Sequence, residues 1–192
     1  MKHVLFLAMA CVLIAAPAAH AQSPGVGVKV GLNVANLSTD EEDFNPKTRT
    51  GVVAGLFVVV PINSAVRFQP EFLYSQQGAK VEDGSDSGTI ELDYFQVPLL
   101  ARFRLGSGSP VGVLVGPSLG FRTRARIKAN GETTDIKDTT ESTDVGLVAG
   151  VSFEGGNSVV DVRYTWGLKD IDKDSTSSAK NRVFSASVGF RF

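Results

Sequence analysis

The last segment of the chain, residues 182–192, alternates between two kinds of side chain. Successive side chains of a β-strand point to opposite faces, so one face of this segment is apolar and the other is small or polar. The apolar face carries Phe184, Ala186, Val188, Phe190 and Phe192. The other face carries Val183, Ser185, Ser187, Gly189 and Arg191. This pattern is typical of a transmembrane β-barrel, whose outer face contacts lipid. A half-buried strand of a soluble protein is the alternative.

The same alternation recurs along the chain and predicts eight strands. We expect them at 26–34, 51–60, 65–75, 92–105, 111–127, 144–154, 158–169 and 182–192. The connections alternate between long polar segments and short turns, as in barrels with long outer loops and short periplasmic turns. The sequence therefore predicts an all-β fold, an eight-stranded antiparallel up-and-down transmembrane β-barrel. An even number of strands predicts that both termini are periplasmic.

The charged residues of these strands share one face, which we expect to line the lumen. They are Lys29, Arg67, Glu71, Arg102, Arg104, Arg122, Asp144, Glu154, Asp161, Arg163, Lys169 and Arg191. A lysine or arginine facing lipid at the bilayer midplane would cost about 2–4 kcal/mol, which explains this restriction. A soluble, lipocalin-like barrel would instead bury its bulky side chains and expose its charges. Its many strand glycines would then have no packing role.

Several segments resemble the PorT-like outer-membrane β-barrel family, a porin-like group. The resemblance rests on VGVKVGLNVANL at 26–37, QPEFLYSQQGAK at 69–80 and LDYFQVPLLARF at 92–103. VGPSLGF at 115–121 and the terminal strand agree with it. The resemblance implies an eight-stranded barrel of the small OmpA or OmpX size in a Gram-negative outer membrane. It also implies a link to secretion or surface assembly, by analogy with the family's namesake, and supplies no reaction.

The first 21 residues have the pattern of a secretory signal peptide. Lys2 and His3 precede an apolar run from Val4 to Ala16, and Ala19-His20-Ala21 fits a cleavage site. Cleavage would leave a barrel domain at 22–192, which is 192 − 21 = 171 residues. A lipobox around Cys11 is the weaker interpretation, because the apolar run continues beyond it.

Removal of this segment limits the chemistry of the remaining chain. It takes away the only cysteine and both histidines, and it changes the net charge from −1 to −2. We therefore expect no disulfide, no thiolate or imidazole metal site, no His-dependent catalysis and no cofactor. The near-neutral charge also argues against a nucleic-acid partner.

The charges of the lumen are the first candidate site. We expect Glu71 near Arg102, Glu154 near Asp161 or Arg163, and Arg191 beside Lys29. As a functional site these groups would line a narrow ion path. As a structural network they would pair and plug the lumen, because unpaired buried charges are costly. Eight strands leave little free bore, so we predict a closed barrel.

A second candidate is the basic row Arg122, Arg124 and Arg126 in the fifth strand. If these guanidinium groups reached the surface, they could bind lipopolysaccharide phosphates. Their alternation predicts instead that they point inward, where they would pair with Glu91, Asp93 and Asp144.

Two acidic loop segments are interpreted as solvated loops. Asp170–Asp174 has the spacing of a calcium loop but lacks its glycine and its bidentate glutamate, and Lys173 opposes a cation. The run Asp40–Asp43 has the same interpretation. Catalysis by Glu154 and Asp161 is also disfavoured, because neighbouring arginines would keep both ionised.

The sequence thus predicts a non-enzymatic outer-membrane protein that acts through its outer loops. A narrow channel and a soluble carrier are the alternatives. Expected partners are outer-membrane lipids including lipopolysaccharide, an unknown protein at the outer loops, and the barrel-assembly machinery, which would receive Phe190 and Phe192 as an assembly signal.

Overall fold

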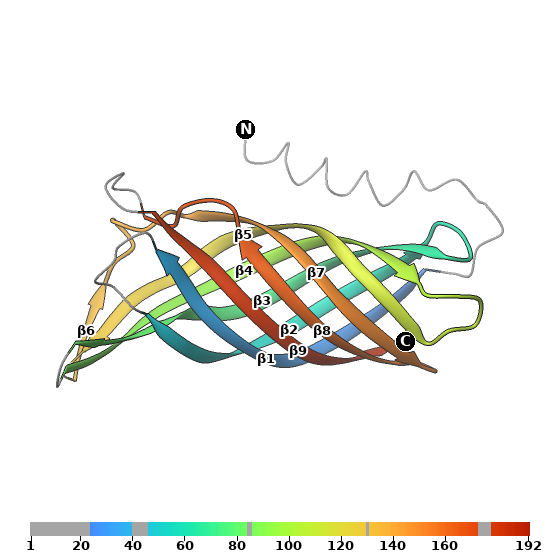
Figure 1. Ribbon diagram of the computed structural model, residues 1–192, viewed down its shortest axis with the longest axis horizontal. Coiled ribbons are helices and arrows are strands. Elements are labelled where there is room, and N and C mark those ends of the chain that lie inside the picture. Colours follow the sequence, from blue (N-terminus) through green and yellow to red (C-terminus); the bar gives the residue numbers. More distant parts are fainter. Residues whose placement is uncertain (1–23, 40–45, 84–85, 130, 173–177) are drawn as a thin grey trace.

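The computed structural model describes residues 24–39, 46–83, 86–129, 131–172 and 178–192, which form one closed barrel (Figure 1). Its strands are β1 (Gly25–Thr39), β2 (Lys47–Pro61), β3 (Val66–Asp83), β4 (Asp86–Arg104), β5 (Val111–Ala129), β7 (Thr143–Gly155), β8 (Ser158–Gly167) and β9 (Ala179–Arg191). Every neighbouring pair is antiparallel, and the β1–β9 and β4–β5 pairings close the sheet. A short strand, β6 (Glu132–Asp135), pairs with β5 alone. The predicted fold class is confirmed.

Tight turns join the strands at one end of the barrel, which we call the short-turn end. In the β2–β3 turn, the Asn63 side chain accepts hydrogen bonds from the backbone N–H groups of Ala65 and Val66, at 2.9 and 2.8 Å. Gly106 and Gly108 have positive φ in the β4–β5 turn, a conformation that glycine adopts without strain. The described chain also starts and ends here, since the Phe192 N–H donates to the Val26 carbonyl at 2.9 Å. We call the opposite end the long-loop end.

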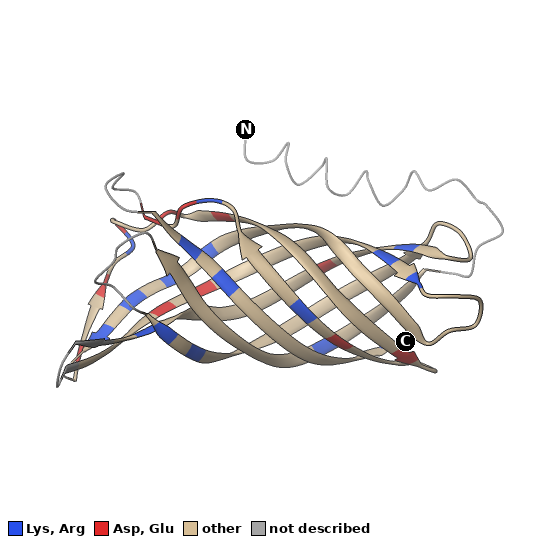
Figure 2. Cartoon of the chain, viewed as in Figure 1, with Lys and Arg blue, Asp and Glu red and all other residues tan. Residues whose placement is uncertain are grey.

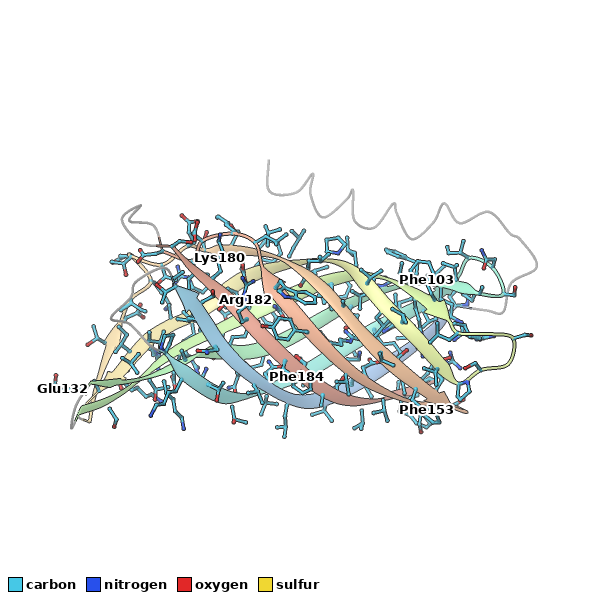
Figure 3. The ribbon with its side chains drawn as sticks, viewed as in Figure 1. Phe103, Glu132, Phe153, Lys180, Arg182 and Phe184 are labelled. Carbon is cyan, nitrogen blue, oxygen red and sulfur yellow. The ribbon has the colours of Figure 1, made fainter. Side chains whose placement is uncertain are left out.

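The outer face of the barrel is apolar over the middle of every strand. On β1, outward-facing valines and a leucine run from Val26 to Val34, and Leu32 is 58% exposed. On β9, Val188 is 57% exposed, and Figure 3 shows Phe184 on the same strand, with Phe103 and Phe153 toward the short-turn end. Each outward apolar run has about the length needed for a tilted strand to cross a bilayer, ~9–11 residues. The predicted outward parity of the bulky apolar residues is therefore confirmed. In the described part of the chain, no helix is both long and apolar enough to cross a membrane.

Several predicted strand limits were wrong at the long-loop end. The segment 77–91, expected to be a loop, is mostly strand, because β3 continues to Asp83 and β4 begins at Asp86. In the segment 38–50, also expected to be a loop, β1 continues to Thr39 and β2 begins at Lys47. The loop expected at 128–143 contains β6. These extensions are polar on their outer face, so they lack the apolar alternation on which the strand prediction depended.

Two register shifts change which side chains face outward near the long-loop end. Asp93 pairs with Arg124 and Tyr94 pairs with Arg122, so Thr123 is an extra residue on β5. This β-bulge reverses the alternation of β5 beyond Arg122. Arg124 and Arg126 therefore share the outer face with their partners on β4, and the prediction that they point inward was wrong. A second shift, between Thr48 and Val53 on β2, has the same effect there.

Small residues on the inner wall make room for the large side chains of the lumen. Phe57 is fully buried, and its ring lies over Gly27 and Gly189. An added Cβ at Gly27 would lie 2.4 Å from Phe57 Cζ. Two further apolar groups fill other levels of the interior: Leu100, Leu114 and Val148 form one, and Leu37, Ala79, Leu92, Tyr94, Ala125 and Ile171 form the other. The lumen is thus packed with side chains.

Candidate functional site

Four charged side chains meet in the lumen and form what we call the central cluster: Lys29, Glu71, Asp161 and Arg163. Arg163 binds Glu71 through both of its terminal nitrogens, at 2.7 and 2.8 Å, and binds Asp161 at 2.6 Å. The Lys29 Nζ lies 3.0 Å from Glu71 Oε1 and 2.6 Å from Asp161 Oδ2. The side chains come from β1, β3 and β8, so the contacts cross the lumen.

The central cluster is balanced in charge and almost completely buried. It contains two cations and two carboxylates, and no side chain in it is more than 7% exposed. Gln69 adds a hydrogen bond to Glu71 Oε1 at 2.7 Å, and the ring of Phe57 lies 5.3 Å from Lys29 Nζ. Buried charges are tolerated when each is paired and its remaining hydrogen-bonding capacity is satisfied. The two cations and the two carboxylates therefore compensate each other in the lumen, although Asp161 Oδ1 and Arg163 Nε have no hydrogen-bond partner among the described residues.

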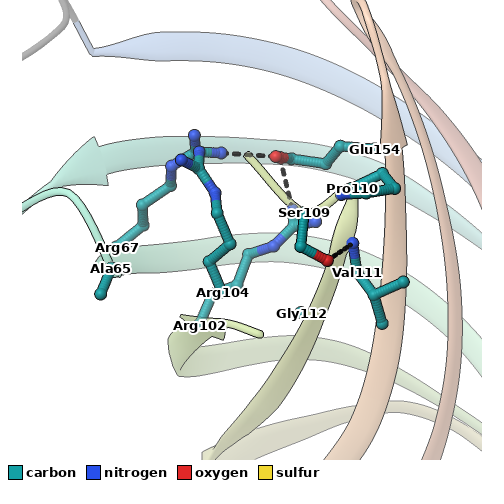
Figure 4. Close-up of a pocket in the computed structure, with 9 residues that line it drawn as sticks. All are labelled: Ala65, Arg67, Arg102, Arg104, Ser109, Pro110, Val111, Gly112 and Glu154. Carbon is teal, nitrogen blue, oxygen red and sulfur yellow. Dashed lines mark hydrogen bonds and ion pairs between the residues drawn. The ribbon is translucent and has the colours of Figure 1, made fainter. Parts of the chain in front are cut away.

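A second group, the short-turn cluster, consists of Glu154 surrounded by arginines (Figure 4). Glu154 lies 2.6 Å from both Arg67 and Arg102, and 3.7 Å from Arg191. Arg104 lines the same recess, which has a free volume of about 10 Å³, space for roughly one water molecule. Because one carboxylate serves several guanidinium groups, this end of the lumen is positively charged.

The charge pairs expected from the sequence were wrong, although their members face the lumen. Arg102 binds Glu154 in place of Glu71, and Glu71 binds Lys29 and Arg163. Glu154 contacts neither Asp161 nor Arg163 and belongs to the other cluster. Arg191 is paired across β1 with Gly27, and its guanidinium reaches toward Glu154 instead of lying beside Lys29.

The lumen at the long-loop end holds the remaining predicted residues. Asp144 accepts a hydrogen bond from Asn181 at 2.9 Å, and that amide also lies 3.3 Å from the Tyr94 hydroxyl. Arg122 faces inward but binds backbone carbonyls, including that of Glu141 at 2.9 Å, so its expected pairing with a carboxylate was wrong. Lys169 binds Glu141 at 2.7 Å.

Neutral polar residues add contacts that the charge pattern did not indicate. Asn33 is fully buried; it donates to Ser75 at 2.9 Å and accepts from Ser185 at 2.8 Å. Gln69 donates to Glu71 Oε1, and Asn181 donates to Asp144 Oδ2. The sequence signal for these contacts was the alternation, which puts these polar residues on the inner face. A polar amide in an otherwise packed lumen needs a hydrogen-bond partner.

A further recess opens toward the long-loop end, above the packed part of the lumen. Its volume is about 270 Å³, and apolar residues make up much of its lining, among them Leu37, Ile90, Leu92, Ile136, Ile171 and Ala179. Tyr94, which is 1% exposed, packs in the same apolar group as Leu37, Leu92 and Ile171. The recess is separated from the short-turn end by the central cluster.

Other predicted features occupy the ends of the chain and the loops. Phe190 and Phe192 are exposed, with ring centroids 5.7 Å apart. The signal peptide predicted at 1–21, the acidic run Asp40–Asp43 and the end of Asp170–Asp174 lie outside the described residues. The described parts contain no group of three or more His, Cys, Asp or Glu side chains placed to hold a metal ion.

Comparison with known proteins assigns the barrel to a family. A family described as "Outer membrane protein beta-barrel domain" matches residues 20–173, well over half of the chain. The chain belongs to this family. A search of curated proteins gave no match. The family assignment and the barrel agree in identifying an outer-membrane β-barrel protein.

Solved structures support the same fold. The attachment invasion locus protein Ail of Yersinia pestis is similar over 89% of this chain and 100% of its own, with 20% identity and a TM-score of 0.55. Neisserial surface protein A covers the same shares at 18% identity and a TM-score of 0.56. At these identities the likeness establishes the architecture of this outer-membrane protein alone.

Proposed function

We propose that this outer-membrane protein is a closed barrel that anchors an interaction surface, formed by its long-loop end, at the outside of the cell. The observation that carries this proposal is the central cluster, because its buried ion pairs cross the lumen and its side chains fill the lumen at that level. The protein is then a structural or interaction protein without enzymatic activity, whose partners at the loops are lipids or another protein. The resemblance to the PorT-like family suggests a role in secretion or surface assembly.

The orientation in this proposal follows from the two kinds of connection. Short turns belong on the periplasmic side of such barrels, which would place both termini there and the extended β3, β4 and β5 outside. Export would use the segment 1–21 as a signal peptide. The barrel-assembly machinery would recognise the terminal strand through Phe190 and Phe192.

Cysteine labelling of whole cells tests the orientation. Cys11 is the only cysteine, so Thr133→Cys in β6 and Asn63→Cys in the β2–β3 turn each add one reporter to the barrel. We expect a membrane-impermeant thiol reagent to label Thr133→Cys in intact cells and Asn63→Cys only after the outer membrane is permeabilised. The reverse pattern would contradict the proposed orientation.

Planar-bilayer recording tests the closed lumen. The folded protein should show no conductance steps, whereas the double variant Glu71→Ala, Arg163→Ala should conduct. This variant removes two side chains from the central cluster and leaves Lys29 paired with Asp161. Regular steps from the unaltered protein would overturn the closed-barrel proposal.

The alternative function is a narrow porin-like channel. The excess of arginine over carboxylate in the short-turn cluster favours it, because such an opening would attract anions. Steps from the unaltered protein that are selective for anions, and that lose this selectivity in Arg104→Gln, would establish the alternative.

A further inference from the structure

The outer face of β2, β3, β4 and β5 carries regular rows of side chains near the long-loop end. Residues directly opposite each other in neighbouring strands share a face and lie close together. The row nearest the middle of the barrel is apolar and aromatic, and contains Ala54, Tyr74, Phe95 and Phe121. The next rows toward the long-loop end contain Gln76, Asp93 and Arg124, then Gly78, Glu91 and Arg126, and then Lys47, Lys80, Thr89 and Lys128.

Cations outnumber carboxylates on these rows. The cations of these rows, which we call the cationic face, are Lys47, Lys80, Arg124, Arg126 and Lys128. The carboxylates that share it are Asp93, Glu91 and Asp135, since Asp135 of β6 pairs with Arg126. Among the side chains that the structure describes on these rows, five cations therefore stand against three carboxylates. The charges in Figure 2 likewise gather toward the long-loop end.

The existing ion pairs leave part of the cationic face uncompensated. Arg124 lies 3.1 Å from Asp93, and Lys128 and Arg49 lie 2.8 and 3.6 Å from Glu91. Within the described residues, Lys80 and Arg126 have no ion pair with a carboxylate. These two cations, one on β3 and one on β5, are the members of the face that an added anion would compensate.

Asp135 does not further compensate the positive charge of the cationic face. It accepts a hydrogen bond from the Lys137 backbone N–H at 3.0 Å, and its carboxylate lies 3.2 Å from the Lys137 Nζ. The backbone hydrogen bond and the lysine charge lower the pKa of Asp135, so it stays ionised. Asp135 forms its ion pair with Lys137, and among the described residues no ion pair joins it to Arg126, which it faces across β5 and β6.

The position of the cationic face relative to the apolar band points to lipid head groups. The Tyr74 hydroxyl donates to Asp93 at 2.6 Å, and the Tyr74 and Phe95 rings lie 6.1 Å apart, so the polar rows begin directly beyond an aromatic row. Aromatic residues of barrels mark the boundary of the hydrocarbon. The three polar rows lie two, four and six residues beyond Phe95, which at roughly 3.3 Å per residue and a tilt of about 40° spans about 5–15 Å above that boundary.

We propose that the cationic face binds the phosphate groups of lipopolysaccharide in the outer leaflet. Guanidinium groups bind phosphate through paired hydrogen bonds, and lysines add point charges. Arg126 and Lys128 are two residues apart on one face of β5, about 7 Å along the strand, so their long side chains can contact one phosphate together. Placing the cationic face in the outer leaflet rests on the proposed orientation. Binding of lipopolysaccharide by the purified protein does not depend on that orientation, so a failure to bind is distinguishable from a failure of the labelling or conductance test.

A pair of double variants tests the site. Arg126→Gln with Lys128→Gln removes two charges from the cationic face. Arg104→Gln with Lys169→Gln removes two charges that lie outside the cationic face: Arg104 lines the recess at the short-turn end, and Lys169 is paired with Glu141. Purified protein in phosphatidylcholine nanodiscs is titrated with labelled lipopolysaccharide and with the same material after enzymatic dephosphorylation. We expect the first variant to weaken binding of intact lipopolysaccharide about fivefold to tenfold, as for the loss of two charge-assisted contacts.

The same titration gives the controls. The second variant should bind lipopolysaccharide as the unaltered protein does, and dephosphorylated material should bind weakly and alike to all three. Heat-dependent gel migration verifies that each barrel is folded. Equal weakening by both variants, or no weakening by the first, would overturn the proposal.

If the first double variant does not fold, a variant that is expected to increase the affinity for lipopolysaccharide tests the same site. Glu91→Gln removes the carboxylate that binds Lys128 and Arg49, and should tighten lipopolysaccharide binding about threefold. Glu132→Gln makes the same charge change opposite Ala129, whose side chain alternates with Lys128 to the other face, and should have no effect. Unchanged or weaker binding by Glu91→Gln would contradict the proposed site.

Discussion

At the scale of single residues, Glu71 holds the central cluster together. It is fully buried and receives hydrogen bonds from Lys29, Arg163 and Gln69. Asp161 alone would have to balance both cations if the charge of Glu71 were lost. Removing one partner of a buried ion pair is much more damaging than removing both, because it leaves an uncompensated charge.

Glu71→Gln should therefore destabilise the folded barrel by about 3–5 kcal/mol. The measurement is urea unfolding of the protein in lipid vesicles, followed by gel migration. Lys169→Gln breaks a more exposed pair with Glu141 and should change stability by less than about 1 kcal/mol. Adding Lys29→Met to Glu71→Gln should recover part of the loss, since Arg163 and Asp161 then remain as a balanced pair. A double variant less stable than Glu71→Gln would contradict the charge-balance account.

The packing of the Phe57 ring against Gly27 leads to a second prediction at the scale of residues. Gly27→Ala would bring a methyl group into the ring of Phe57 and should cost about 1–3 kcal/mol. Phe57→Leu in the same chain should restore part of that stability, because the smaller side chain withdraws from the added Cβ. Urea unfolding of Gly27→Ala, Phe57→Leu and the double variant measures the coupling. Additive effects of the two substitutions would show that the ring and the glycine do not depend on each other.

Sequence reasoning at this scale found the inward-facing charges but not their partners. Alternation determines the face of a residue from its neighbours in the chain. The partner of Glu71, in contrast, depends on the stagger of β3 and β8 across the lumen, where Arg163 approaches it from a strand that is not adjacent. Nothing in the pattern of either strand encodes that stagger, so Arg102 on the neighbouring strand was the natural but wrong choice.

At the scale of elements, the bulge at Thr123 determines which side chains of β5 point into the lumen and which point outward. Below it, Arg122 points into the lumen; above it, Ala125 is fully buried and Arg124 points outward. The sequence predicted the strand but not the bulge, because no glycine or proline marks the extra residue. The basic row was consequently assigned to the lumen. The extensions of β3 and β4 were missed for a related reason, since strands beyond the lipid need no apolar face.

Deleting Thr123 should leave the faces of β5 unchanged. Without the extra residue Arg122 is followed directly by Arg124, so ordinary alternation still directs the first inward and the second outward. The deletion removes one hydrogen bond, from the Thr123 hydroxyl to the Asp93 carbonyl, and the barrel should fold with a small loss of stability. Deleting Ser118 should instead turn Leu119 and Phe121 into the lumen and abolish folding. Heat-dependent gel migration of the two deletions distinguishes them, and equal behaviour would contradict the assigned bulge.

At the scale of the whole molecule, the barrel has a packed interior with a charge-balanced central cluster. An apolar band surrounds this interior, and polar strand extensions lie beyond one edge of the band. Val30 of β1 lies in the middle of that band, 52% exposed and paired with Ala54 and Val188. Asn36 lies on the same face of the same strand, beyond Val34, where the apolar run ends. The two positions differ in their depth in the proposed membrane, and Asn36 also accepts a hydrogen bond from the Leu37 N–H at 2.9 Å.

Val30→Arg should therefore destabilise the barrel in lipid vesicles by about 2–4 kcal/mol, and Asn36→Arg by no more than about 1 kcal/mol. The cost arises from placing a cation among lipid chains, so it should shrink when unfolding is measured in detergent micelles, where water reaches the protein surface more easily. A soluble barrel would show neither difference, because both side chains would then face water. Equal stability of the two variants in vesicles would place the edge of the hydrocarbon somewhere other than between Val34 and Asn36, and would remove the basis for assigning the cationic face to lipid head groups.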